Sequence, residues 1–300
     1  MTFIRIAKIC LTISAVAALA SAVLLFSPGP KFSIEFTGGT LMSLSLPAGK
    51  TKDELSTIAK SWKTADGTSL ENVAVSAVKD LGGGSSFSIR MRPLSNEEHV
   101  SLLAHIQQTF PEARELQFNT IGPSVSASLK RNTFVALSVA SVIIVAYLAF
   151  AFRKMPRKLS PWKFGVLAVV AFLHDVLITT GVFIVIGQFT SFEFDTLFVT
   201  ALLTVLAYST SDTIVIFDRI RANMSFENRS ESFTDTAVRG MKESITRTFG
   251  TGLSTLIMLT ALFFLGAESI RWFILALIFG IFIGTYSSFF VASALLVFWK

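Results

Sequence analysis

The sequence predicts a polytopic α-helical membrane protein with six transmembrane helices and one α+β domain outside the membrane. Its 300 residues are 52% hydrophobic and 15% charged, with a mean hydropathy of +0.63. Soluble domains carry about 25% charged residues, so this chain lacks much of the charge that a water-soluble surface needs. Together with the single cysteine, this composition excludes a soluble enzyme, a nucleic-acid-binding domain and a disulfide-built secreted module.

Six apolar segments have the length of a membrane span. The hydrocarbon core of a bilayer is about 30 Å thick and takes about 20 residues of helix. Residues 9–30, 132–152, 248–267 and 272–299 contain no Asp, Glu, Lys or Arg. The predicted spans are residues 9–26, 133–152, 164–186, 196–217, 248–265 and 272–299.

The first apolar segment has two interpretations. Arg5 and Lys8 precede it, as in a secretory signal. A cleaved signal has an apolar core of about 7–15 residues, whereas this run continues to Phe26, beyond the small residues Ala20 and Ala22. We expect a retained anchor, and a cleaved signal is the alternative.

Basic residues in the short loops predict the orientation, because such loops favour the cytoplasm. Two loops are rich in basic residues. The loop between the second and third spans has Arg153, Lys154, Arg157, Lys158 and Lys163. The loop between the fourth and fifth spans has Arg219, Arg221, Arg229, Arg239, Lys242 and Arg247. The loop 188–195 has none, and 266–271 has only Arg271. We therefore expect both termini to be cytoplasmic. The expected parts are residues 1–29, an outer domain at 30–131, and a five-helix bundle at 132–300 with a cytoplasmic loop at 218–247.

The outer segment predicts its own α+β fold. We expect strands at 32–36, 41–46, 72–78, 86–92 and 115–121, and helices at 51–62 and 95–108. Ser95 and Glu98 have the spacing of a capping box, and Gly82-Gly83-Gly84 is expected to form a turn. The order of elements is typical of a ferredoxin-like split βαβ sandwich.

Two carboxylates lie inside predicted spans, where an ionisable group is costly and indicates function by default. Asp175 follows His174 in the third span, and Asp212 lies in the fourth. At about 1.5 Å per residue, Asp175 is about 18 Å and Asp212 about 9 Å from the cytoplasmic ends of their helices. The alternative for each is a structural hydrogen bond between helices.

Other polar and small residues accompany these carboxylates. Hydroxyl groups beside Asp212 and charged groups near the cytoplasmic boundary are the supporting candidates: Ser209, Ser211, Thr213, Asp218, Arg219 and Arg247. An ordinary interfacial charge cluster is the alternative for the charged ones. Gly280 and Gly284 form a Gly-xxx-Gly step, which allows a close helix contact within this chain or with a partner. No cysteine or histidine spacing predicts a metal site.

The segment Tyr208-Ser-Thr-Ser-Asp-Thr-Ile-Val-Ile-Phe-Asp-Arg-Ile-Arg221 resembles the fourth-span signature of the SecD/SecF family of protein-export membrane proteins. Further motifs agree in order: Glu35-Phe-Thr-Gly-Gly-Thr40, Ile121-Gly-Pro-Ser124, His174-Asp175, Arg247-Thr248 and Gly284-Thr-Tyr-Ser-Ser288. The resemblance covers essentially the whole chain. Ala222 departs from the family pattern and leaves the cytoplasmic charge cluster one carboxylate short.

The resemblance implies half of a transporter of the resistance-nodulation-division type in the bacterial cytoplasmic (inner) membrane. The implied partners are a separate SecD-like subunit, the Sec translocon channel, the translocating preprotein and membrane lipid, without nucleic acid. The proton-motive force would promote translocation, with protons as the coupling ion, no cofactor and no enzymatic activity. We expect Asp212 to be the principal proton relay and Asp175 the second.

Two other functions remain as alternatives. A related proton-driven transporter of lipids or small molecules is compatible with the composition. An intramembrane aspartyl protease also places two aspartates on adjacent helices, but the sequence lacks the Gly-x-Gly-Asp and Pro-Ala-Leu motifs. The predicted depths of the two aspartates also differ by about 9 Å, too far for one shared water.

Overall fold

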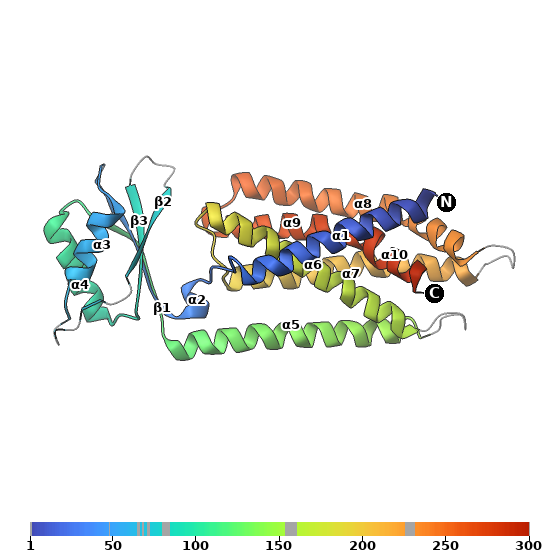
Figure 1. The fold of residues 1–300 in the computed structure, drawn as a ribbon, viewed down its shortest axis with the longest axis horizontal. Coiled ribbons are helices and arrows are strands. Elements are labelled where there is room, and N and C mark those ends of the chain that lie inside the picture. The colour runs from blue at the N-terminus through green and yellow to red at the C-terminus, as the bar shows by residue number, and fades with distance from the viewer. Residues whose placement is uncertain are drawn as a thin grey trace. The chain divides into compact units, whose positions relative to one another are not determined.

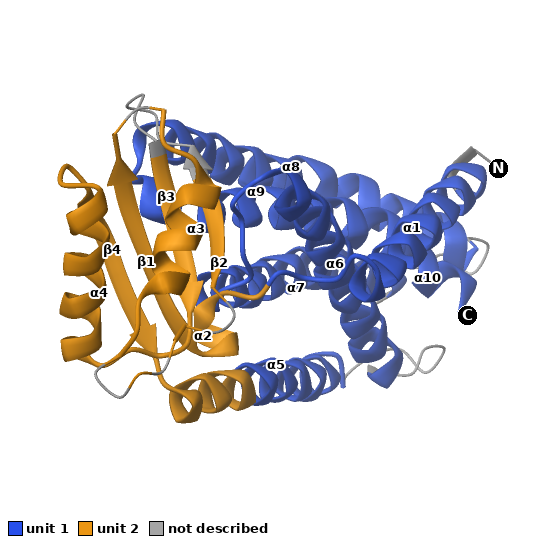
Figure 2. Ribbon diagram, turned by 60° about the vertical axis from the view of Figure 1, so that its left-hand side comes forward, with its two compact units in different colours: residues 1–31, 133–300 blue, residues 32–132 orange. Residues whose placement is uncertain are grey.

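The structure is a computed structural model that describes residues 2–47, 49–64, 67, 69–70, 73–79, 85–153, 161–225 and 232–299. The predicted turn at Gly82-Gly83-Gly84 and the basic residues Lys154, Arg157, Lys158 and Arg229 lie outside these residues. The chain divides into two compact units, which are residues 1–31 with 133–300, and residues 32–132 (Figure 2).

The helical unit confirms the prediction of six spans. Among the described residues, six helices are long and apolar enough to cross a membrane (Figure 1). Five are continuous: α1 (Thr2–Phe26), α5 (Pro123–Ala151), α6 (Pro161–Phe189), α7 (Thr196–Ser225) and α8 (Phe233–Leu265). The sixth span consists of a 3-10 turn (Glu268–Ile270), α9 (Arg271–Ser287), a π-helical segment (Ser288–Ala292) and α10 (Ser293–Phe298).

The helices extend beyond the predicted spans. Most of the predicted loop at 218–247 is helical, because α7 continues to Ser225 and α8 begins at Phe233. The Ser232 side chain caps α8 by accepting a hydrogen bond from the Asp235 N–H, which stabilises a helix start. The first charged residue marks the membrane boundary, but a helix does not need to end there. In Figure 1 both chain termini lie at the end of the helical unit where α7 ends and α8 begins.

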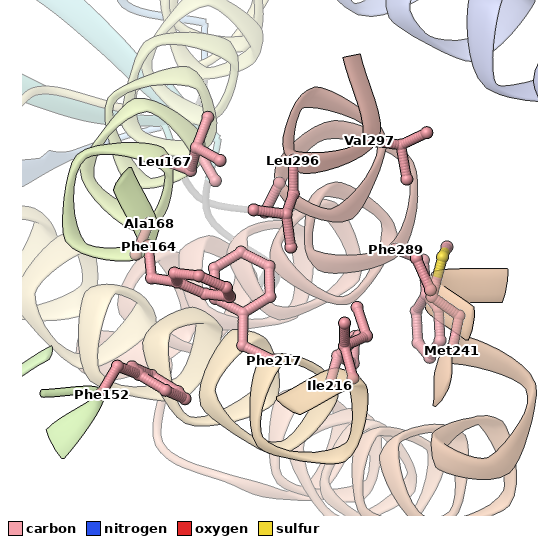
Figure 3. Packing of buried hydrophobic residues seen from close by; sticks show 14 of the residues in the cluster. Phe152, Phe164, Leu167, Ala168, Ile216, Phe217, Met241, Phe289, Leu296 and Val297 are labelled. Atoms are coloured by element: carbon pink, nitrogen blue, oxygen red, sulfur yellow. The ribbon is translucent and has the colours of Figure 1, made fainter. Parts of the chain in front are cut away.

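An aromatic core joins the helices near the α5 C-terminus. The Phe164 ring lies 5.1 Å from Phe152 and 5.0 Å from Phe217, between ring centroids, which is a favourable separation for aromatic pairs. Figure 3 shows these rings together with Ile216, Phe289 and other members of the same buried cluster. This packing fixes α7 against α6 and the last span.

Small residues allow close contacts between helices inside the bundle. A Cβ atom added at Gly280 would lie 2.9 Å from Cγ1 of Val205, and one at Gly284 would lie 3.0 Å from Cβ of Ser209. Both glycines of the last span therefore face α7 of the same chain. The structure places this contact within the chain, which was one of the two alternatives that the sequence left open.

The second unit is a four-stranded antiparallel sheet with two helices. Its strands are β1 (Gly39–Leu46), β2 (Ala74–Lys79), β3 (Ser85–Met91) and β4 (Arg114–Ile121), in the order β2-β3-β1-β4. With α3 (Lys52–Ser61) and α4 (Asn96–Thr109), the chain order is β1-α3-β2-β3-α4-β4. This is the split βαβ arrangement.

The predicted strand at 32–36 is wrong. Residues Ile34–Thr37 form a short helix, α2, instead. The Ser33 side chain accepts a hydrogen bond from the Glu35 N–H, and Gly38 ends the helix with φ 72°, a conformation that favours glycine. These capping residues decided the local structure against the apolar alternation.

Alternation along the strands builds the core of this unit. Met42, Leu44 and Leu46 are buried on one face of β1 and pack in one cluster with Leu55 of α3 and Ile106 of α4. The predicted capping box is confirmed: the Ser95 hydroxyl accepts from the Glu98 N–H, and the Glu98 carboxylate accepts from the Ser95 N–H.

Candidate functional site: a buried carboxylate beside a polar cavity

Asp212 lies on α7 at the wall of a cavity inside the helical unit. Its side chain is buried and accepts one hydrogen bond, from the Thr285 hydroxyl at 3.3 Å. The cavity has a volume of about 220 Å³ and is lined by residues of α7 and α8: Tyr208, Ser211, Asp212, Val215, Arg247, Thr248 and Thr251. A polar cavity of this size holds several water molecules.

Several polar groups in this cavity have no protein partner. Among the described residues, the hydroxyls of Tyr208 and Thr248 are buried and form no hydrogen bond. Arg247 lines the same cavity, and within the described chain it makes no direct ion pair with Asp212. Buried polar atoms are almost always paired with protein or water. The cavity wall therefore combines a carboxylate, hydroxyls without a protein partner and an arginine.

Asp175 on α6 has different surroundings. It is fully buried and accepts hydrogen bonds from Ser209 at 2.7 Å and from Ser287 at 2.8 Å, both at Oδ2. Its Oδ1 lies 2.9 Å from Nδ1 of His174. Of the hydroxyls predicted to surround Asp212, Ser209 thus belongs to Asp175, and Thr213 pairs with Ser288 at 2.9 Å. Ser211 lines the Asp212 cavity.

The predicted difference in depth between the two carboxylates is wrong. Thr285 contacts Asp212 and Ser287 contacts Asp175, and two residues of helix rise only about 3 Å. The prediction measured each depth from a charged residue at the helix end, but α6 and α7 both extend past those residues. The two carboxylates nevertheless do not share a site, because Asp175 is not among the residues that line the cavity.

The charge cluster at the end of α7 includes a carboxylate that the sequence analysis missed. Arg219 pairs with Glu243 of α8 at 2.6 Å, and the Asn223 amide donates to the same carboxylate at 2.9 Å. Asp218 pairs with Arg221 at 2.6 Å within α7. Glu243 thus adds a negative charge to this cluster.

Other residues of the site also escaped the sequence analysis. Tyr208, Thr248, Thr251, Thr285 and Ser287 are neutral hydroxyl residues in spans, and Ser and Thr are frequent at contacts between membrane helices. Some of them lie in the motifs Arg247-Thr248 and Gly284-Thr-Tyr-Ser-Ser288, which indicate the family but do not assign a role to each hydroxyl.

Six apolar helices around a buried polar site, with an α+β unit between the first two, define a multi-pass membrane protein. The chain belongs to the SecD/SecF family. Residues 101–300 match the family model described as "Protein export membrane protein SecD/SecF, C-terminal", and residues 23–46 match the "SecD/SecF GG Motif". Membership of this family supports a role in protein export.

Several relatives resemble nearly the whole chain. A protein translocase subunit SecF from Thermobaculum terrenum is 36% identical over 274 residues, which are 91% of this chain and 85% of the relative. A protein translocase subunit SecDF from Thermus thermophilus is 35% identical over 95% of this chain and 36% of its own length.

A solved structure has the same fold. The crystal structure of SecDF from Thermus thermophilus, described as a translocon-associated membrane protein, superposes with a TM-score of 0.82 at 32% identity. The match covers 100% of this chain and 38% of the SecDF chain. This chain thus spans little more than a third of that protein.

Proposed function

We propose that this chain is the SecF-like half of a proton-driven complex that promotes protein translocation across the bacterial inner membrane, together with the Sec translocon. Asp212 is its proton carrier. The observation that carries this proposal is the cavity beside Asp212, with Arg247 and the unpartnered hydroxyls of Tyr208 and Thr248 in its wall.

The proton role follows from the cost of charge inside a membrane. Loss of a proton from Asp212 creates a charge that water or a cation must stabilise. The cavity can supply both, since it has room for water and Arg247 is among the residues that line it. Binding and release of a proton therefore change how α7 and α8 attract each other at this point. Such a local charge change can bias a conformational equilibrium.

The orientation proposed from the sequence has support at the helix ends. Both chain termini lie at the end of the helical unit where α7 ends and α8 begins (Figure 1), which is the end of the basic residues. At the same end Lys163 donates to the Trp299 carbonyl at 3.0 Å, and Trp162 packs on Trp299. Trp and Lys at span ends are typical of membrane interfaces. We infer that both termini are cytoplasmic and that residues 32–132 lie outside.

A SecD-like partner is proposed to cover the face where the Asp212 cavity opens. The exposed side of α7 carries small or hydroxyl residues at helical spacing: Thr200, Thr204, Ala207 and Ser211. On α8, Thr251 and Ser254 are exposed, and both follow Arg247 closely in the sequence. Small and hydroxyl residues are enriched at helix contacts in membranes. In contrast, α1 and α5 expose large apolar residues such as Val16 and Val142, which suit lipid.

The test is export driven by a proton gradient in sealed vesicles that contain the chain, a SecD-like subunit and the translocon. Asp212→Asn keeps the size of the side chain and its ability to accept from Thr285, but it cannot release a proton. It should abolish the stimulation by the gradient and leave ATP-driven translocation and complex assembly intact.

Two further variants sharpen the test. Asp212→Glu keeps the titratable group and should retain part of the stimulation. Ser141→Ala is a control in the same unit, because it lies on α5, away from the proposed partner face, and its hydroxyl bonds only the Leu137 carbonyl of its own helix. A full response of Asp212→Asn to the gradient would refute the proposed function.

A further inference from the structure

The last span contacts both buried carboxylates at the point where its helical form changes. Thr285 donates to Asp212 and Ser287 donates to Asp175. The next residues, Ser288–Ala292, are π-helical before α10 resumes the α-helix. A π-helical turn holds an extra residue and is frequent at functional sites. The position of Thr285 relative to Asp212 thus depends on what holds this segment in register.

A continuous set of hydrogen bonds holds the segment against α6 and α7. Asp175 accepts from Ser287 and from Ser209 at the same oxygen. The Ser288 hydroxyl has one proton for two acceptors, the Gly284 carbonyl at 2.9 Å and the Ser209 carbonyl at 3.3 Å, and it lies 2.9 Å from the Thr213 hydroxyl. The Ser288 carbonyl accepts from the Ser293 hydroxyl at 2.7 Å and from the Ser293 backbone N–H. Asp175 is the one carboxyl group among these residues.

The surroundings of Asp175 favour a fixed role over exchange with water. Its side chain has no exposed surface, and it accepts two hydroxyl hydrogen bonds in addition to its contact with His174. Both hydroxyl bonds, at 2.7 Å and 2.8 Å, have the usual length of a well-formed O–H···O hydrogen bond. Gly284 brings α9 close enough to α7 for one carboxylate to reach serines on both helices.

We propose that Asp175 is a positioning residue that holds Ser287 and Ser209 together, sets the register of the π-helical segment, and so keeps Thr285 against Asp212. The proposal rests on the proposed function, because it assigns Asp175 to the support of the Asp212 site. It replaces the expectation that Asp175 is a second proton carrier with a role in which Asp175 carries no protons during transport.

A disulfide between α8 and α9 reports this register directly. A Cβ atom at Gly252 would lie 3.4 Å from Oγ1 of Thr285. Because the sulfur of Thr285→Cys can take the place of Oγ1, the two cysteines come within reach of the short bonds that a disulfide requires. The double variant Gly252→Cys with Thr285→Cys, in a Cys10→Ser background, should therefore cross-link on mild oxidation of the full chain in its complex. The reaction requires position only, and it does not depend on export.

Asp175→Leu, which cannot accept a hydrogen bond, and, separately, Ser287→Ala are then added to this double variant. Loss of one partner of a buried hydrogen bond changes the ratio of two arrangements by roughly tenfold, so the rate of cross-linking should fall by about that factor in the folded fraction. Ser141→Ala is the matched serine control, because its hydroxyl bonds only the Leu137 carbonyl of its own helix, and it should leave the rate unchanged. Ser287→Ala serves where Asp175→Leu does not accumulate. An unchanged rate in both variants overturns the proposal.

Export separates this inference from the proposed function. With the native Gly252 and Thr285, Asp175→Leu should reduce the response to the proton gradient several-fold but retain it, whereas Asp212→Asn abolishes it. Loss of the response in Asp175→Leu with an unchanged cross-linking rate would contradict the positioning role. A full response in Asp212→Asn would instead contradict the proposed function.

Discussion

The contact between Gly280 and Val205 makes a sharp prediction about stability. A methyl group added at Gly280 would overlap both γ-methyl groups of Val205, with 2.9 Å to Cγ1, and would lie 3.1 Å from its Cβ. Val205 is fully buried, so its side chain has no free space to enter. Overpacking of this kind costs about 1–3 kcal/mol, and the better helix propensity of alanine offsets less than about 1 kcal/mol of it.

A double-mutant cycle isolates this contact. Val205→Ala alone removes two buried methyl groups and should cost about 1–3 kcal/mol, because a cavity remains. Combined with Gly280→Ala, it removes both overlapping atoms. The double variant should therefore be about 1–2 kcal/mol more stable than the sum of the single effects predicts.

The assay is unfolding of the purified chain in mild detergent with a denaturing detergent, followed by tryptophan fluorescence. Gly250→Ala is the control, because no atom lies within 4 Å of its added Cβ, and it should be neutral or slightly stabilising. If the effects of the two single variants simply add in the double variant, the packing argument is refuted, and Gly280 does not face Val205.

Three further predictions concern topology, pH and the partner. Reporters fused after Lys79 should report the outer compartment, and those after Arg157 and Arg239 the cytoplasm; Arg157 outside would contradict the orientation. The Arg92 guanidinium holds the pKa of Glu98 below its usual range, with help from the Ser95 N–H. The extra stability of wild type over Arg92→Gln should therefore be complete above about pH 4.3 and vanish as the pH falls through the lowered pKa of Glu98, measured by hydrogen exchange of the α4 amides; a difference that persists at low pH would exclude this origin. Thr204→Trp should reduce co-purification of a SecD-like subunit, whereas Val139→Trp on α5 should not; equal recovery would move the partner away from α7.

Much of the fold was predictable because long apolar runs have few alternatives. Residues 9–26 and 272–299 can satisfy their backbone in a membrane only as helices, and both are helical. The strand predicted at 32–36 failed because Ser33 and Gly38 cap a short helix there, and this capping outweighs an alternation of only five residues. The predicted ends of α7 and α8 were wrong, because charged residues mark where the membrane ends and not where a helix ends.

The site was predictable only in part. A carboxylate in a span is conspicuous, so Asp212 and Asp175 were found. Their partners lie 34–112 residues away in sequence, as Ser209, Ser287 and Thr285 are from the carboxylates they bond. Only the packing of the helices decides which hydroxyl reaches which carboxylate. For the same reason the sequence alone does not predict the ion pair between Arg219 and Glu243, which depends on how α7 packs against α8.

Proton flux through the assembled complex tests the central claim most directly. The chain and a SecD-like subunit are reconstituted into sealed vesicles with a pH-sensitive dye inside, and an inward proton gradient is imposed. Acidification of the lumen should be faster than in vesicles without protein. Asp212→Asn should reduce it to the level of empty vesicles, and Ser141→Ala should leave it at the wild-type rate. Equal acidification by Asp212→Asn and wild type would contradict the assignment of Asp212 as the proton carrier.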